Sequence, residues 1–227
     1  MSAYDVVTFD CYGTLIDWEK GITEAFAAKA AELGRPAPQR EEILAAYHAA
    51  EPEIEAGSYR PYRDVLAATA SRVAPRLGWS LSEKHAAFLA ESLPSWPPFA
   101  DTNPALTRLS RAGIRLGILS NVDEDLLAGT RTHLDVSFDL VVTAQRVRSY
   151  KPGHAHFTTA RAALGPGERW LHAAQSYFHD VTPAVAHRIP AAWINRKAEP
   201  PTGAARPDRE FRTLTELADW LTATPSR

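Results

Sequence analysis

Five short apolar runs, separated by longer segments, constrain the fold of this chain more than any other feature. The runs cover residues 6–9, 116–119, 140–143, 170–174 and 191–194. Each has the length of a buried strand. Helical segments are expected between the last four runs, at residues 123–133, 155–164 and 182–187. This alternation predicts βαβ units with right-handed crossovers, so the expected fold class is α/β with a doubly wound parallel sheet.

The interval between the first two runs is too long for a single crossover. Its apolar residues recur at helix spacing from residue 22 to residue 33, and Gly34 suits a helix end. Further helices are expected at residues 40–55, 63–77 and 82–93, followed by a stiff linker rich in proline. We therefore expect a core domain of residues 1–15 and 98–227 and an inserted helical cap domain of residues 16–97. After the last strand, we expect a surface loop from Glu199 and a closing helix at residues 213–222.

Composition narrows the class of protein. The 227 residues, 45% hydrophobic and 23% charged, fit an ordered globular chain. The net charge of −2 gives no general attraction to nucleic acid or to an anionic membrane. A single cysteine, Cys11, excludes an intrachain disulfide and favours a reducing compartment. With no signal peptide or transmembrane pattern, we expect a cytoplasmic protein that acts on a small molecule, as a monomer or a homodimer.

Polar residues stand after four of the predicted strands. Asp10 follows the first, Ser120 and Asn121 follow the second, Lys151 comes after the third and Asp180 after the fourth. The carboxyl ends of parallel strands meet at one edge of a sheet, where open α/β folds bind their ligands. The sequence therefore predicts one site that contains all of these residues.

These motifs make the chain resemble the haloacid dehalogenase superfamily of hydrolases, and most of all its type II 2-haloacid dehalogenase branch. The resemblance covers essentially the whole chain. The residues that carry it are Asp10-Cys11-Tyr12-Gly13-Thr14-Leu15, Ile118-Leu119-Ser120-Asn121, Tyr150-Lys151-Pro152, Asp180 and Trp193-Ile194-Asn195-Arg196.

The resemblance implies a mechanism and a set of catalytic residues. Asp10 would displace halide from C2 of a small 2-haloalkanoic acid and form an aspartyl ester, which water then hydrolyses to the 2-hydroxy acid. Lys151 would keep the nearby carboxylates ionised, and Asp180 would orient Lys151 or activate the water. The turn that ends at Thr14 would orient Asp10, and Ser120 would offer a neutral donor.

A second set of residues is expected to bind the substrate. Tyr12 fits a pocket wall and a catalytic donor equally well, and His179 fits a base or a structural hydrogen-bonding residue. Asn121 and Asp180 could also serve as helix caps. The Cys11 side chain follows a buried strand and is expected to pack. The full set is Cys11, Tyr12, Asn121, Tyr62, Arg60, Gln175, Ser176 and His179.

Two positions favour a dehalogenase over the alternative, a Mg²⁺-dependent phosphatase of a small metabolite. Superfamily phosphatases use an acid two residues after the nucleophile, where this chain has Tyr12, whose ordinary pKa is about 10. They also bind Mg²⁺ with an acid where this chain has Gln175. We therefore expect no metal and no cofactor. A non-hydrolytic binding protein, the third interpretation, would have no need of Asp10, Lys151 and Asp180.

The cap region departs from the dehalogenase pattern. The family's cap arginine, which helps to withdraw the halide, has no clear match, and His48 or an aliphatic residue aligns with it. Arg40, Arg60 and Arg63 are the nearest substitutes. The sequence leaves the halide, chain length and stereochemistry of the substrate open.

Overall fold

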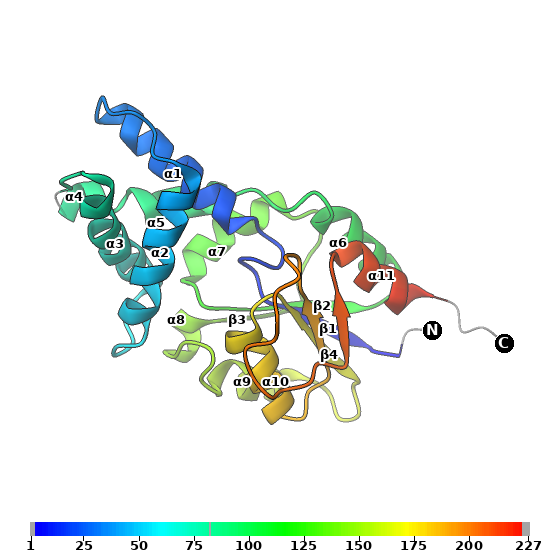
Figure 1. Ribbon diagram of the computed structural model, residues 1–227. Helices are drawn as coiled ribbons and strands as arrows, with labels where there is room; N and C mark the ends of the chain where they lie inside the picture. The colour runs from blue at the N-terminus through cyan, green and yellow to red at the C-terminus, as the bar shows by residue number, and fades with distance from the viewer. Residues whose placement is uncertain (1–2, 82, 224–227) are drawn as a thin grey trace.

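A six-stranded parallel sheet forms the centre of the molecule in the computed structural model, which describes residues 3–81 and 83–223 (Figure 1). The spatial order is β3-β2-β1-β4-β5-β6, and all neighbouring strands pair in parallel. This confirms the predicted fold class. The strands are β1 (Val6–Phe9), β2 (Arg115–Ser120), β3 (Leu140–Thr143), β4 (Trp170–Ala174), β5 (Ala191–Ile194) and β6 (Arg209–Phe211).

Helices cover both faces of the sheet, as its apolar runs require. Successive side chains of a strand point to opposite faces. In β1, Val7 belongs to the same buried cluster as residues of α6 (Thr102–Arg111) and α11 (Leu214–Thr222). Val6 belongs to a second cluster with residues of α9 (Ala155–Ala163) and α10 (Thr182–Ala186). Figure 1 shows these two helix pairs on opposite sides of the sheet.

The strand order places a topological switch point beside β1. From β1 the chain moves to β2 and β3 on one side and then returns to β4 on the other. The carboxyl ends of β1 and β4 therefore border the crevice where doubly wound folds bind ligands. The residues that follow these two strands begin with Asp10 and Gln175.

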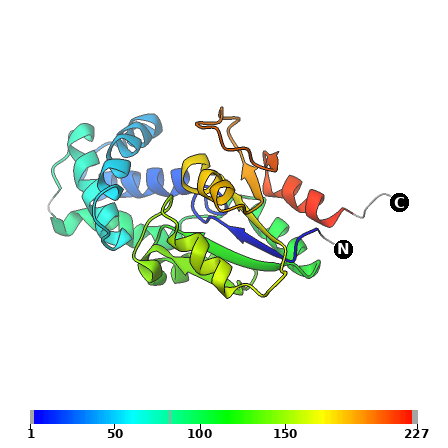
Figure 2. The same ribbon diagram turned by 90° about the horizontal axis from the view of Figure 1, so that it is seen from below.

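The segment between β1 and α6 forms a separate helical group beside this edge of the sheet (Figures 1 and 2). The predicted helix at 82–93 is two short helices, and its expected start at Ser82 lies outside the described residues. The group contains α1 (Trp18–Glu32), α2 (Arg40–Glu55), α3 (Tyr62–Val73), α4 (Glu83–Ala86), α5 (Phe88–Ser92) and the 3₁₀ turns Ala74–Leu77 and Leu93–Ser95.

Some elements were not predicted. Strand β6 lies in the expected surface loop. It is a short edge strand with two charged residues, Arg209 and Glu210, so it lacks the apolar pattern by which the other strands were predicted. Helix α6 follows the proline-rich linker and buries Ala105, Leu106 and Leu109. Helix α8 (Ala144–Val147) and the π-helical turn Tyr177–Val181 before α10 were also not predicted, whereas α7 (Glu124–Thr130) and the 3₁₀ turn Arg131–His133 lie where a helix was expected at residues 123–133.

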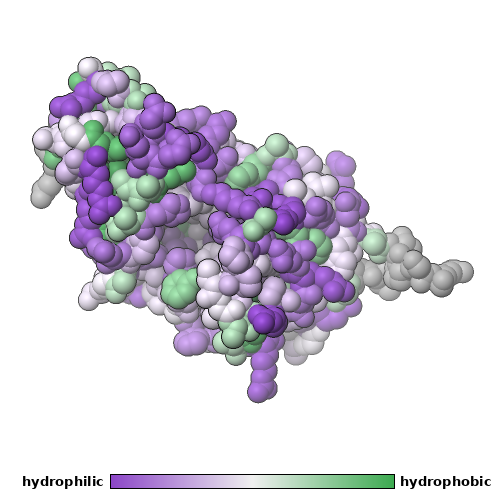
Figure 3. All heavy atoms as spheres, in the orientation of Figure 1, coloured by the Kyte–Doolittle hydropathy of each residue, from purple (hydrophilic) through white to green (hydrophobic). Residues whose placement is uncertain are grey.

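Among the described residues, no helix is both long and apolar enough to cross a bilayer. On the face in Figure 3, hydrophilic residues cover most of the surface, and the hydrophobic patches between them are small.

Candidate active site

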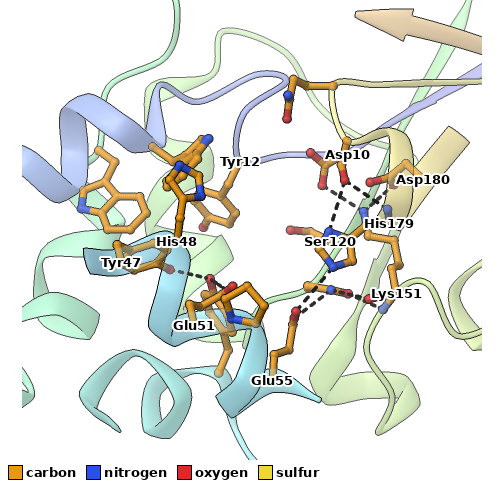
Figure 4. Close-up of a pocket in the computed structure, with 17 residues that line it drawn as sticks. Asp10, Tyr12, Tyr47, His48, Glu51, Glu55, Ser120, Lys151, His179 and Asp180 are labelled. Atoms are coloured by element: carbon orange, nitrogen blue, oxygen red, sulfur yellow. Dashed lines mark hydrogen bonds and ion pairs between the residues drawn. The ribbon is translucent and has the colours of Figure 1, made fainter. Parts of the chain in front are cut away.

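The predicted strand-end residues meet in one pocket between the sheet and the helical group (Figure 4). Its volume is about 290 Å³, the size of a site for a small molecule. The sheet side contributes Asp10, Ser120, Asn121, Lys151, Gln175, Ser176, His179 and Asp180, and the remaining wall consists of Tyr12, Trp18, Tyr47, His48, Glu51, Pro52, Glu55, Tyr62 and Trp96.

Lys151 joins the two buried carboxylates of the site. Its Nζ donates hydrogen bonds to Oδ1 of Asp10 at 2.9 Å, to Oδ1 of Asp180 at 2.6 Å and to the carbonyl oxygen of Leu119 at 2.8 Å. These three bonds use all the protons of the ammonium group. Because Lys151 is 2% exposed, its position is fixed and water screens its charge little.

The charges of this triad follow from the competition between burial and pairing. Burial opposes the positive charge of Lys151, but Asp10 and Asp180 outweigh it and raise the pKa of Lys151. Burial also acts on Asp180, yet Lys151 and then His172 outweigh it and lower the pKa of Asp180 to about 2. At Asp10, burial exceeds the attraction of Lys151, so the pKa of Asp10 is raised. Asp10 is thus a poorly solvated carboxylate held beside a fixed cation.

A tight turn after β1 fixes the second oxygen of Asp10. Thr14 donates from Oγ1 to Oδ2 of Asp10 at 2.9 Å, and the same Oγ1 accepts the backbone N–H of Gln175 at 2.9 Å. Gly13 has a φ of 97°, which favours glycine, and a Cβ there would lie 3.1 Å from Nε1 of Trp18. The Thr14 hydroxyl therefore links Asp10, at the end of β1, to the end of β4.

A buried relay that sequence reasoning missed supports Asp180 from within the sheet. Nε2 of His172 lies 2.9 Å from Oδ1 of Asp180, and Nδ1 of His172 lies 2.8 Å from Oγ1 of Thr8. Thr8 in turn accepts the indole N–H of Trp170 at 2.8 Å. In the tautomer that carries a proton on Nε2, His172 donates to Asp180 and can accept from the Thr8 hydroxyl. Residues 170 and 172 alternate along β4 and therefore point to the same face of the sheet. This spacing could have predicted that Trp170 and His172 share a partner on β1.

Two polar atoms in the pocket wall have no partner within the described part of the chain. They are Oγ of Ser120 and Oδ2 of Asp180, both in buried positions. A buried polar atom without a partner is costly and marks a place where a ligand or water binds. Ser120 can donate to a substrate, and Oδ2 of Asp180 can accept a proton from a water molecule.

The other predicted binding residues divide into two groups. Tyr12, Tyr62, Asn121, Gln175, Ser176 and His179 line the pocket. Asn121 also closes the loop before Lys151, because its Oδ1 accepts the Lys151 N–H at 2.7 Å. His179 lies 3.2 Å from Oγ of Ser176 through Nδ1, and burial lowers its pKa, so it is an uncharged hydrogen-bonding residue at neutral pH.

Two of the expected substrate contacts need correction. The Cys11 side chain is fully buried in the core cluster and does not line the pocket, as its place after a buried strand requires. Arg60 also lies outside the lining, and its guanidinium donates to the carbonyl oxygen of Ile54 at 3.2 Å. Packing in the core therefore holds the Cys11 side chain, and the hydrogen bond to Ile54 holds the Arg60 side chain.

No arginine lines this pocket among the described residues. Arg40 pairs with Glu19 at 2.8 Å, and Arg63 pairs with Asp125 at 2.5 Å and with Asp123 at 3.2 Å. The candidates for a cap cation are thus engaged elsewhere. Instead, α2 directs Tyr47, His48, Glu51 and Glu55 into the pocket. Their spacing of three and four residues in the predicted helix was a signal for one shared face.

The donor set does not fit a divalent cation. Asp10 and Asp180 both direct Oδ1 to Lys151, and Gln175 offers a neutral amide in place of a carboxylate. Mg²⁺ needs a near-octahedral set of oxygen ligands with anionic members. In the part of the chain that the structure describes, no three His, Cys, Asp or Glu residues gather as a metal site.

The doubly wound sheet and the cluster of Asp10, Thr14, Lys151 and Asp180 at its carboxyl edge define the chain as a hydrolase with an α/β fold. The chain belongs to the haloacid dehalogenase-like hydrolase family, whose sequence model matches residues 4–173.

Individual relatives extend over nearly the whole chain. An (S)-2-haloacid dehalogenase (H-109) of Pseudomonas putida is 26% identical over 97% of this chain and 99% of its own length. A second (S)-2-haloacid dehalogenase of Pseudomonas putida is 30% identical over 64% of this chain and 65% of its own. The crystal structure of an L-2-haloacid dehalogenase has a TM-score of 0.82 and 26% identity, and covers 98% of this chain and 100% of that one.

Proposed function

We propose that this chain hydrolyses the carbon–halogen bond of a small 2-haloalkanoic acid and releases the 2-hydroxy acid. The observation that carries the proposal is the Asp10 carboxylate, buried at the pocket wall and held by Lys151 and Thr14. The relatives that span nearly the full chain are (S)-2-haloacid dehalogenases, which supports the same reaction class here.

In the first step, a carboxylate oxygen of Asp10 attacks C2 of the substrate. The new O–C2 bond replaces the C2–halogen bond, whose electron pair leaves with the halide. Partial desolvation makes the carboxylate a better nucleophile, and the fixed bonds to both of its oxygens hold it in one orientation. Ser120 Oγ, which lacks a partner, is placed to donate to the substrate carboxylate.

In the second step, water hydrolyses the aspartyl ester. Oδ2 of Asp180 accepts a proton as the water oxygen bonds to Cγ of Asp10. The Cγ–O bond to the product then breaks, and the product oxygen takes that proton from Asp180. The second proton of the water, now on the Asp10 carboxyl, is released to solvent, and Asp10 is again a carboxylate. Lys151 next to Asp10 favours the negative charge that develops on the carbonyl oxygen.

Tyr12 and Gln175 favour this reaction over phosphoryl transfer. A halide leaves without a proton, whereas a phosphate monoester needs an acid at its leaving oxygen. Burial raises the pKa of Tyr12 well above 10, and its hydroxyl lies 2.9 Å from Oγ1 of Thr130, turned to the protein. Tyr12 is thus a poor acid and serves as a wall of the pocket.

A single-turnover experiment in ¹⁸O-water tests the ester. With enzyme in excess over 2-chloropropanoate, we expect the label in the Asp10 carboxyl and none in the first product. Direct attack of water on C2 would place the label in the first product and contradict the ester. Asp10→Asn should abolish halide release while the circular dichroism spectrum stays that of the wild type.

We also propose the organisation expected from the sequence. Residues 1–15 and 98–227 would form the core domain and residues 16–97 the cap domain, because the pocket lies where these parts meet. The single cysteine supports a cytoplasmic location.

The oligomeric state expected from the sequence is a monomer or a homodimer. Light scattering after size-exclusion chromatography distinguishes a monomer from a homodimer.

A further inference from the structure

Two cap glutamates give the pocket an acidic wall that dehalogenation of a simple 2-haloalkanoate does not use. Glu51 and Glu55 lie one turn apart on α2 and face the pocket from the side opposite Asp10 and Asp180 (Figure 4). The Glu55 side chain is only 8% exposed. By contrast, Glu53 on the same helix is 73% exposed and pairs with Arg72. The two glutamates are therefore turned inward, away from the solvent that a helix-surface acid normally meets.

Neither glutamate has a cation of its own within the described residues. Glu51 accepts from the Tyr62 hydroxyl at 3.4 Å, and Glu55 accepts from Nδ2 of Asn121 at 2.9 Å. Nε2 of His179, a ring that burial keeps neutral, lies 3.7 Å from Oε2 of Glu55. The ammonium of Lys151 has no proton left for them, since its three bonds go to Asp10, Asp180 and a carbonyl oxygen.

No paired cation offsets the negative charge that Glu51 and Glu55 carry when they ionise, among the residues that the structure describes. Burial raises the pKa of Glu51 to about 7, and burial together with the charge of Glu51 raises the pKa of Glu55 to about 8. Like charges at i and i+4 on a helix repel each other, so ionisation of both carboxyl groups is unfavourable while the pocket is empty. A bound cation would favour the ionised forms of both groups, whereas a bound carboxylate would oppose them further.

Aromatic rings stand beside the two carboxyl groups. Trp18, Tyr47 and Tyr62 line the same pocket, with the Trp18 and Tyr47 ring centroids 5.7 Å apart. The faces of tryptophan and tyrosine rings attract organic cations, and quaternary ammonium groups are bound by such rings in other proteins. Carboxylates and aromatic rings together form a recognisable environment for an organic ammonium group.

We propose that Glu51 and Glu55 bind an organic ammonium group, so that the substrate is a 2-haloalkanoic acid with a cationic group on its chain. This inference rests on the proposed function for the reacting end of the substrate. C2 lies at Asp10 and the substrate carboxylate at Ser120, while the cationic end faces α2. The glutamates thereby determine specificity and take no part in bond breaking.

Matched substrates test the proposal. The probe is a series of 2-chloro-ω-(trimethylammonio)alkanoates of increasing chain length, which cannot cyclise. The control series replaces the ammonium nitrogen with carbon, giving tert-butyl groups of the same shape. We expect kcat/KM to be at least tenfold higher for the best cationic substrate than for its neutral isostere. Equal or reversed preference in the wild type would overturn the proposal.

Variants connect the preference to the two glutamates. In Glu51→Gln/Glu55→Gln, the ratio of kcat/KM between cationic and neutral substrates should fall to near one, while hydrolysis of the neutral isostere persists. Glu53→Gln, a solvent-facing neighbour on the same helix, is the matched control and should keep the wild-type ratio. An unchanged ratio in the double variant would reject the role of the glutamates, provided that circular dichroism shows a folded protein.

A binding measurement separates this inference from the proposed function. If no 2-haloacid in either series or 2-chloropropanoate releases halide, the dehalogenase proposal fails. Calorimetry with halogen-free trimethylammonioalkanoates then still tests the cation site. Binding by the wild type and Glu53→Gln that the double variant loses would support the site, and equal affinity of all three proteins, or no binding, would refute it.

Discussion

Replacing Lys151 with methionine tests whether one lysine neutralises both carboxylates of the site. Methionine has similar bulk and no charge, so the change leaves Asp10 and Asp180 facing each other in a buried position. It also removes the donor to the Leu119 carbonyl oxygen. Breaking a buried ion pair by removing one partner costs about 3–5 kcal/mol. We therefore expect Lys151→Met to lower the free energy of unfolding by about this amount at pH 7.

The loss of stability in Lys151→Met is expected to depend on pH. Asp180 has a folded-state pKa of about 2, below the ordinary value of 3.8. Its contribution to stability is complete above pH 3.8 and is lost as the pH falls through about 2. In Lys151→Met the two carboxyls lose the cation that favours their charged forms, so they bind protons more readily. The stability difference from the wild type should thus be largest near pH 7 and should shrink towards pH 4.

Urea unfolding followed by circular dichroism measures both effects. A loss below about 1 kcal/mol at pH 7, the range of an exposed ion pair, would contradict the reasoning. So would a loss that does not change with pH. The double variant Lys151→Met/Asp180→Asn removes one of the orphaned charges and should recover part of the stability, because the two residues are in direct contact. Strict additivity of the two single changes would mean that the Lys151–Asp180 pair is not the cause.

Three further predictions concern the same pocket. Thr14→Val removes one bond to a charged oxygen of Asp10, and at about 1.5–3 kcal/mol it should lower kcat by roughly 10- to 100-fold with KM little changed in steady-state assays; an unchanged kcat would contradict its role. EDTA should leave halide release unaffected, whereas phosphate release from a small phosphorylated metabolite that EDTA abolishes and Mg²⁺ restores would favour the phosphatase alternative. The folded-state pKa of Glu55, about 8 against an ordinary 4.5, penalises folding increasingly from about pH 4.5 to pH 8. Glu55→Gln should therefore gain thermal stability relative to the wild type between pH 5 and pH 8, and a gain that is the same at both pH values would refute this.

The positions of Asp10 and Asp180, two of the candidate catalytic residues, could be anticipated because each follows a strand that the sequence defines well. Asp10 follows an unbroken apolar run, and Asp180 follows another by a few residues. In a parallel sheet, chain direction alone brings such positions to one edge. Their proximity thus followed from local pattern and topology, without any knowledge of side-chain positions.

The opposite wall of the pocket could not be anticipated in the same way. Glu51 and Glu55 lie on an amphipathic helix, where sequence gives a shared face but does not say what that face meets. Nothing in the sequence excluded Arg40 and Arg63 from the pocket. In the structure, Arg40 pairs with Glu19, and Arg63 pairs with Asp123 and Asp125. Such pairings join residues far apart in the chain and depend on how the helices dock.

The parallel α/β core and the place of Asp10 at its edge could be predicted from the chain alone, because strand periodicity and chain direction are local properties that decide which residues reach that edge. The charges around Asp10 became visible only in the folded molecule, where Lys151 contacts two carboxylates, His172 contacts Asp180, and α2 offers two glutamates and no arginine to the pocket. The physical reason is that burial and pairing, which set charge and affinity, arise only when separate elements pack together.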